Sequence, residues 1–179
     1  SRIVRVGDTF LLEADGQRLP LYAYMSYQPA KACYGAFRQA GVRLFCISVY
    51  AGDRGINPVS GIRPFRPGFW KAPGVFDFSY VEEDFRLAVG AAAPGEVFLL
   101  PRLMLEPPGW WEDQHPQALC RDFSGLALHT SFSSPEWLSA QEEAMRAFKD
   151  WLERSGWDRY VAGWHLAGGS TEEFLRPML

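Results

Sequence analysis

The sequence predicts an α/β fold in which buried parallel strands alternate with helices. Four apolar runs are of the kind found in strands that are covered on both faces. Segments with helical spacing of apolar residues separate these runs, and two short strand-like runs precede them. Such an alternation builds a parallel sheet with right-handed crossovers.

The first 18 residues are predicted to form a β-hairpin. Residues 3–6 and 9–12 are joined by Gly7-Asp8, and a second turn follows at Asp15-Gly16. Glycine supplies the positive φ that such turns require. Residues 19–179 are predicted to form a partial (β/α) barrel domain, which begins with a strand at 19–24.

Two strand–helix units follow. A helix at 31–40 ends at Gly41, and a buried strand comes next at 42–49. Residues 50–77 show no period and are expected to form a long loop, a feature that is usually functional. The helix at 78–93 is predicted to start at Ser79 as its N-cap, with Glu82 completing a capping box.

The second half repeats this order. A buried strand at 96–105 leads into a polar loop that reaches about residue 133. The last long helix is predicted to begin after Ser134 as its N-cap, with Pro135 at the first helical position, and to end near Arg154. Residues 160–167 are the fourth buried strand.

A complete TIM (β/α)8 barrel needs roughly 250 residues. Because this chain has 179 residues and four core strands, it is either a complete small α/β domain or the N-terminal half of a barrel. We favour the half barrel: four parallel strands with covering helices, preceded by the short hairpin. Its two open sheet edges predict self-association, or pairing with the remainder of the barrel.

Composition excludes several partners. The chain has 18 Lys and Arg against 21 Asp and Glu, so it lacks the excess of positive charge that binding to a phosphate backbone requires. No nucleic-acid partner is therefore expected. The apolar runs are short and no signal peptide is present, so no membrane partner is expected and a cytoplasmic location is slightly favoured. The three cysteines and three histidines are scattered, which predicts neither a metal site nor a cofactor.

Aromatic residues make up 15% of the chain, which predicts either a core rich in aromatic rings or a cleft lined with rings, as sugar-binding sites often have. The predicted strand at 96–105 is followed by Glu-Pro-Pro-Gly-Trp-Trp at 106–111, and then by His115-Pro116. The prolines fix the backbone, while Trp110 and Trp111 provide large flat rings on which the C–H faces of pyranoses pack. A purely structural loop packed by these tryptophans is the alternative.

This segment resembles the third-strand segment of the β-galactosidases of glycoside hydrolase family 42 and their relatives in the retaining clan A. The resemblance spans about residues 19–174 and implies a (β/α)8 barrel that acts on a β-linked, galactose-type sugar. Residues 164–174, Trp-His-Leu-Ala-Gly-Gly-Ser-Thr-Glu-Glu-Phe, are similar to a variant in uncharacterised relatives.

The resemblance implies that Glu173 is the general acid/base at the end of the fourth strand. It puts Glu172 in the place of the usual Asn, which binds the sugar 2-hydroxyl; the assignment of Glu172 as the acid stays open. A retaining glycosidase uses two carboxyls about 5–5.5 Å apart. The clan's nucleophile lies on strand seven, so we expect the chain to lack it. Alternatively, the glutamate pair lies in the exposed first turn of a helix.

Other residues are candidates for substrate binding. Arg102 lies in an apolar strand, either buried beside the glutamate pair or facing solvent on an edge strand. His165 either orients a substrate hydroxyl or is a core histidine with satisfied hydrogen bonds. The remaining candidates for the sugar cleft are aromatic or charged loop side chains: Asp53, Arg54, Phe69, Trp70, Trp110 and Trp111.

The leading hypothesis is a catalytic-domain fragment of a retaining, β-galactosidase-like glycoside hydrolase that carries the acid/base but not the nucleophile. Taken alone, such a fragment is not expected to hydrolyse efficiently. The alternative is a non-catalytic carbohydrate-binding or interaction module on the same half barrel. A third hypothesis is an unrelated α/β enzyme in which Glu172 and Glu173 act with a metal.

Overall fold

A four-stranded parallel sheet is the centre of the fold. The computed structural model describes residues 1–53 and 65–168. The strands are β4 (Tyr24–Ser26), β5 (Leu44–Tyr50), β8 (Phe98–Met104) and β11 (His165–Ala167), and each is hydrogen-bonded to the next in this order. All three pairings are parallel. Neighbours in the sheet therefore follow one another along the chain.

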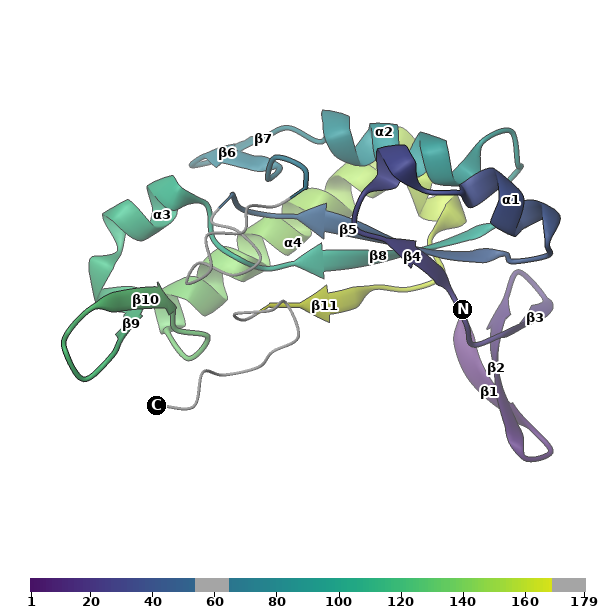
Figure 1. Cartoon of the computed structure of the whole chain (residues 1–179), viewed down its shortest axis with the longest axis horizontal. Coiled ribbons are helices and arrows are strands. Elements are labelled where there is room, and N and C mark those ends of the chain that lie inside the picture. The colour runs from purple at the N-terminus through teal and green to yellow at the C-terminus, as the bar shows by residue number, and fades with distance from the viewer. Residues whose placement is uncertain (54–64, 169–179) are drawn as a thin grey trace.

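The connecting helices cover one face of this sheet (Figure 1). They are α1 (Tyr34–Gln39), α2 (Ser79–Val89) and α4 (Pro135–Ser155), with one-turn helices η1 (Pro29–Lys31) and η3 (Trp157–Tyr160) beside them. Phe85 of α2 and Phe148 of α4 are fully buried in one core with Leu99 of β8. Strands in chain order with helices on one face wind as in a barrel, since a doubly wound sheet has helices on both faces. The predicted α/β class is confirmed, and the arrangement is consistent with a partial barrel.

A small antiparallel sheet precedes the four parallel strands. It consists of β1 (Arg2–Val6), β2 (Thr9–Ala14) and β3 (Gln17–Pro20). The leading hairpin is confirmed, but the predicted strand at 19–24 is wrong. Leu19 pairs with Leu12 and packs with Leu44 and Phe98 at the amino ends of the parallel strands, so the first parallel strand begins only at Tyr24.

Both predicted loops contain short elements. The first includes a hairpin of β6 (Trp70–Ala72) and β7 (Val75–Phe76). The second includes α3 (Gly109–Gln114), η2 (Pro116–Ala118) and the paired strands β9 (Leu119–Arg121) and β10 (Ala127–Thr130). These elements are too short to show the hydrophobic periodicity by which helices and strands are recognised in a sequence. They lie beyond the carboxyl ends of the parallel strands (Figure 1).

One helix start was predicted correctly and one was not. Ser134 accepts a hydrogen bond from the amide of Trp137 at 3.2 Å, which confirms it as the N-cap of α4. In α2 the N-cap position is Phe78, and Asp77 accepts from the amide of Ser79 at 3.0 Å. The predicted capping box is therefore wrong, because an earlier carboxylate satisfies the free amide.

The fourth strand is shorter than predicted. Residues 157–160 form η3, and only His165–Ala167 form a strand. Ala162 still donates its amide to the carbonyl of Leu99 at 2.9 Å, so the pairing with β8 begins before the strand does. No helix in the described part of the chain is long and apolar enough to cross a membrane.

Candidate functional site

A row of polar side chains crosses the sheet on the face that none of the described helices covers. Ser48 of β5 and His165 of β11 are both register partners of Arg102 on β8. Tyr27 directly follows β4, whose last residue, Ser26, pairs with Ile47. These positions alternate with Ile47, Val49 and Leu103, which belong to the helix-side core. The polar residues therefore share the opposite face.

Arg102 is the centre of this row. Its side chain is only 5% exposed and lies on the third strand of the sheet, which has a neighbour on each side. Its Nη1 donates to the hydroxyl of Tyr27 at 2.7 Å, and its guanidinium carbon lies 5.7 Å from the centre of the Tyr27 ring. Tyr27 is 37% exposed, so this pair connects the buried sheet face to solvent.

His165 is exposed on β11, and so it is not a buried core histidine. Partial burial lowers the pKa of its imidazole, and the positive charge of Arg102 lowers it further. The neutral ring can donate one hydrogen bond and accept another. Neutral imidazole next to a cationic guanidinium gives this end of the row both donors and an acceptor.

The tryptophans pack mainly against each other. Trp70 and Trp111 are only 2% and 4% exposed, so neither presents an open ring face to a sugar. Trp111 stacks on His115 with 4.1 Å between ring centres and meets Trp137 edge-on at 4.8 Å. For Trp111 the structure supports the alternative of a loop packed by tryptophans, and Trp70 of the first loop is buried to a similar extent. Trp110 is half-buried and meets Trp70 edge-on at 5.2 Å.

The loops after β5 and β8 are in backbone contact. A Cβ atom on Gly52 would lie 2.2 Å from the carbonyl carbon of Pro107, and one on Gly68 would lie 2.5 Å from the carbonyl carbon of Gly52. Asp53 accepts a hydrogen bond from the amide of Gly109 at 2.7 Å. Glycine permits this close approach. The edge of the sheet next to the polar row is thus rigidly built.

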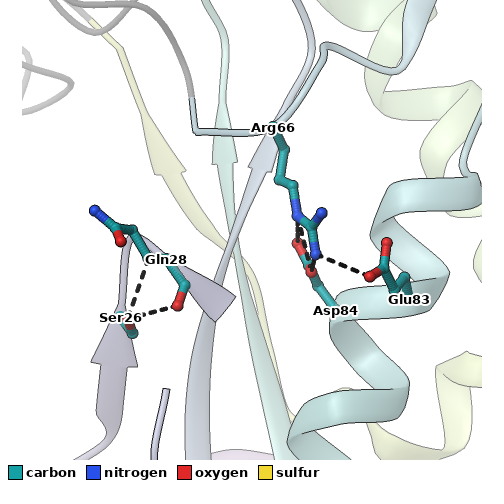
Figure 2. A network of polar contacts seen from close by, with 5 residues as sticks. All are labelled: Ser26, Gln28, Arg66, Glu83 and Asp84. Carbon is teal, nitrogen blue, oxygen red and sulfur yellow. Dashed lines mark hydrogen bonds and ion pairs between the residues drawn. The ribbon is translucent and has the colours of Figure 1, made fainter. Parts of the chain in front are cut away.

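An ion pair anchors the chain that leads back from the first loop (Figure 2). Arg66 contacts Asp84 of α2 at 2.5 Å and Glu83 at 3.3 Å. Asp84 is 2% exposed, and its burial raises the pKa of its carboxyl although Arg66 acts in the opposite direction. Figure 2 also shows Ser26, which accepts a hydrogen bond from the amide of Gln28 at 3.1 Å.

Sequence reasoning missed Tyr27, Ser48 and Arg66. Their positions depend on strand register and on a contact between distant segments, for which the sequence has no local signal. Glu172, Glu173 and Arg54 lie outside the described residues. Phe69 is 1% exposed and belongs to the helix-side core. In the described ranges, no group of three or more His, Cys, Asp and Glu side chains could hold a metal ion.

Comparisons with known proteins give a likeness to a solved structure. No family model matches the chain, and no curated protein matches it. The crystal structure of β-galactosidase from the psychrophilic Marinomonas ef1 is similar, at 20% sequence identity and a TM-score of 0.47. The match covers 80% of this chain and 20% of that one, so the chain spans about a fifth of that protein's length. β-Galactosidase activity is a property of that protein.

Proposed function

We propose that this chain is part of the catalytic barrel of a retaining, β-galactosidase-like glycoside hydrolase and binds carbohydrate on the helix-free face of its sheet. The observation that carries the proposal is the row formed by Tyr27, Ser48, Arg102 and His165. It lies near the carboxyl ends of parallel strands, where sheets of this class bind their ligands.

The chemistry of the row suits a sugar. The exposed Tyr27 hydroxyl and the exposed, neutral His165 imidazole can donate to and accept from the hydroxyl groups of a pyranose, while Arg102 and Ser48, 5% and 4% exposed, are buried beside them. The hydrogen bond from Arg102 fixes the Tyr27 hydroxyl, which can then donate its own proton, before a ligand arrives. A donor held in place in this way orients a substrate at a smaller entropic cost.

Glu173 would be the proton donor in such an enzyme, with Glu172 beside it. Both follow β11, the strand that carries His165, along the chain. The acid protonates the leaving oxygen, while a second carboxylate about 5–5.5 Å away attacks the anomeric carbon. That nucleophile would come from a later strand of a complete barrel. Such later strands would pair with β4 and β11, the outer strands of the sheet in the described residues.

The second candidate is a non-catalytic carbohydrate-binding or interaction module. The same polar row supports it, because sugar binding needs no second carboxylate. The two functions differ in whether a nucleophile comes within reach of Glu173, so hydrolysis distinguishes them.

Binding is tested by NMR titration of this chain with methyl β-galactoside. We expect shifts at His165, and a several-fold weaker affinity in Tyr27→Phe, which removes only the hydroxyl that holds Arg102. Arg146→Ala is the control, because Arg146 is an exposed residue of α4 paired with Glu142. No shift at His165, or equal effects of the two variants, contradicts the proposed site.

Catalysis is tested in a polypeptide that contains the complete barrel. Glu173→Gln is expected to slow hydrolysis of β-galactosides with poor leaving groups by a large factor, and that of activated aryl galactosides much less. An equal loss on both substrates contradicts the role of Glu173 as the acid. Absence of hydrolysis in the unsubstituted barrel favours the binding module.

A further inference from the structure

A cleft lies on the outer, helical side of the fold, away from the polar row. Its volume is about 530 Å³, and it lies between the β6–β7 hairpin, the start of α2 and the second half of α4. Ligand sites in proteins commonly have about 300–1,000 Å³. The residues that matter for its chemistry are Phe76, Asp77, Phe78, Glu82, Trp151 and Arg154.

Three nearly parallel aromatic rings line this cleft. Phe76 and Phe78 are 6.3 Å apart between ring centres with 13° between their planes, and Phe78 and Trp151 are 4.9 Å apart at 19°. Stacked carbon atoms touch at about 3.5–4 Å, so rings with these longer centre distances are displaced sideways relative to one another. Phe78 also stacks on the buried Phe69 at 4.9 Å. All three are half-buried. Together they form a partly open aromatic strip.

Buried aromatic residues of the helix-side core hold the rings of this strip in place. Phe76 stacks on Trp70 at 5.8 Å, and Trp151 stacks on Phe148 at 5.8 Å. Trp70 and Phe148 are both buried in the helix-side core. A ligand on the strip would therefore meet rings that have already lost their rotamer freedom, which lowers the cost of binding.

Charges of both signs surround the strip. Asp77 accepts hydrogen bonds from Ser79, which lower the pKa of its carboxyl and keep it ionised. Glu82 pairs with Arg86 at 2.5 Å. Arg154 is exposed and forms no ion pair with any residue in the described parts of the chain. The cleft thus offers carboxylate acceptors and guanidinium donors next to apolar rings.

This combination selects a neutral ligand with one apolar face and several hydroxyl groups. Mixed charge argues against a simple anion or cation. Parallel rings also do not enclose a common centre, which an aromatic cage for a quaternary ammonium group requires. A pyranose has both properties. Its C–H face packs on aromatic carbon, and its hydroxyls can hydrogen-bond to the charged side chains of Asp77, Glu82 and Arg154.

We infer that this outer cleft is a second carbohydrate-binding site, separate from the polar row, that holds part of an oligosaccharide chain. The inference shares with the proposed function only the class of ligand and does not depend on catalysis. Two sites that engage one polysaccharide would raise the overall affinity without any new contact at either site.

The test is a ¹⁵N NMR titration with three separate probes: β-1,4-galactotetraose, cellotetraose and xylotetraose. At least one probe is expected to shift the indole N–H of Trp151. Arg154→Ala is expected to raise the Kd for that probe about tenfold, the loss of a hydrogen bond to a charged group. Arg146→Ala on the same helix, outside the cleft, is the matched control and is expected to leave the Kd unchanged.

Two results overturn this inference: no shift of Trp151 with any of the three probes, or equal effects of Arg154→Ala and Arg146→Ala. Tyr27→Phe separates the two sites, because it is expected to weaken binding at His165 and to leave the Trp151 response intact. Shifts at Trp151 without shifts at His165 support carbohydrate binding in the outer cleft and contradict binding at the polar row. Shifts at His165 without shifts at Trp151 contradict binding in the outer cleft and support binding at the polar row.

Discussion

Arg102 and His165 occupy the same register on the neighbouring parallel strands β8 and β11. One carries a permanent positive charge and the other a titratable ring, and the charge of Arg102 is one of the two causes that lower the pKa of His165. This pair connects strand register directly to a measurable property of the candidate site.

Replacing Arg102 with Met is expected to raise the pKa of His165. Removal of the guanidinium removes a repulsion of the imidazolium, but burial, which is the larger cause, remains. The pKa in Arg102→Met is therefore expected to stay below 6.5, the ordinary value. NMR titration of the His165 ring measures it, and Arg146→Ala serves as a distant charge control. An unchanged pKa in Arg102→Met would show that the two side chains do not interact.

The same histidine gives a pH dependence to stability. Because its folded-state pKa lies below the unfolded value, the folded state binds fewer protons between the two values. The stabilisation from His165 is therefore fully present at pH values above its pKa in the unfolded chain. It is lost as the pH falls through its lower pKa in the folded protein. Between about pH 7 and 5, the urea midpoint of the wild type is expected to fall more than that of His165→Gln. Parallel curves for the two proteins would contradict this expectation.

Gly52→Ala is expected to destabilise the protein strongly. The new Cβ would lie 2.2 Å from the carbonyl of Pro107, a contact with backbone that cannot move aside cheaply. Gly35→Ala is the matched control, since its nearest neighbour is a side-chain atom of Arg38 at 3.8 Å and it lies in α1. There alanine is expected to be neutral or stabilising by up to about 1 kcal/mol. Urea unfolding of both variants gives the comparison, and equal stability would be inconsistent with the backbone contact.

Arg66→Met is expected to lower the free energy of unfolding by up to about 3–5 kcal/mol, because it leaves the carboxylate of Asp84 buried without its counterion. Glu83→Gln, which removes the more exposed partner of Arg66, is expected to cost at most about 1 kcal/mol. Chemical denaturation measures both. Similar small losses in the two variants would mean that the ion pair with Asp84 does not anchor the segment.

Ser134→Ala removes the N-cap of α4 and is expected to cost about 1 kcal/mol. Ser79→Ala is the comparison, because the amide of Ser79 is satisfied by Asp77 and its own hydroxyl is not a cap. It is expected to cost much less. A larger loss in Ser79→Ala than in Ser134→Ala would reverse the assignment of the two helix starts.

Elements long enough to repeat their pattern were predicted well. The strand at 98–104 buries nearly every residue, and α4 buries one stripe of residues at helical spacing; both patterns can be recognised in the local sequence. The strand predicted at 19–24 was wrong because Leu19 satisfies the apolar pattern equally well in the antiparallel sheet. Short elements such as β6, β7 and α3 span one or two repeats and depend on contacts with other segments.

The amino-acid sequence by itself determined the α/β class, the alternation of buried strands with helices and the presence of many aromatic rings, because hydrophobic periodicity and composition are local properties. Only the tertiary structure decided which side chains share a face and which rings are open. Strand register puts Tyr27, Ser48, Arg102 and His165 in one row, and packing buries Trp70 and Trp111 while Phe76, Phe78 and Trp151 stay partly open. Register and burial depend on segments far apart in the chain, so no local pattern encodes them.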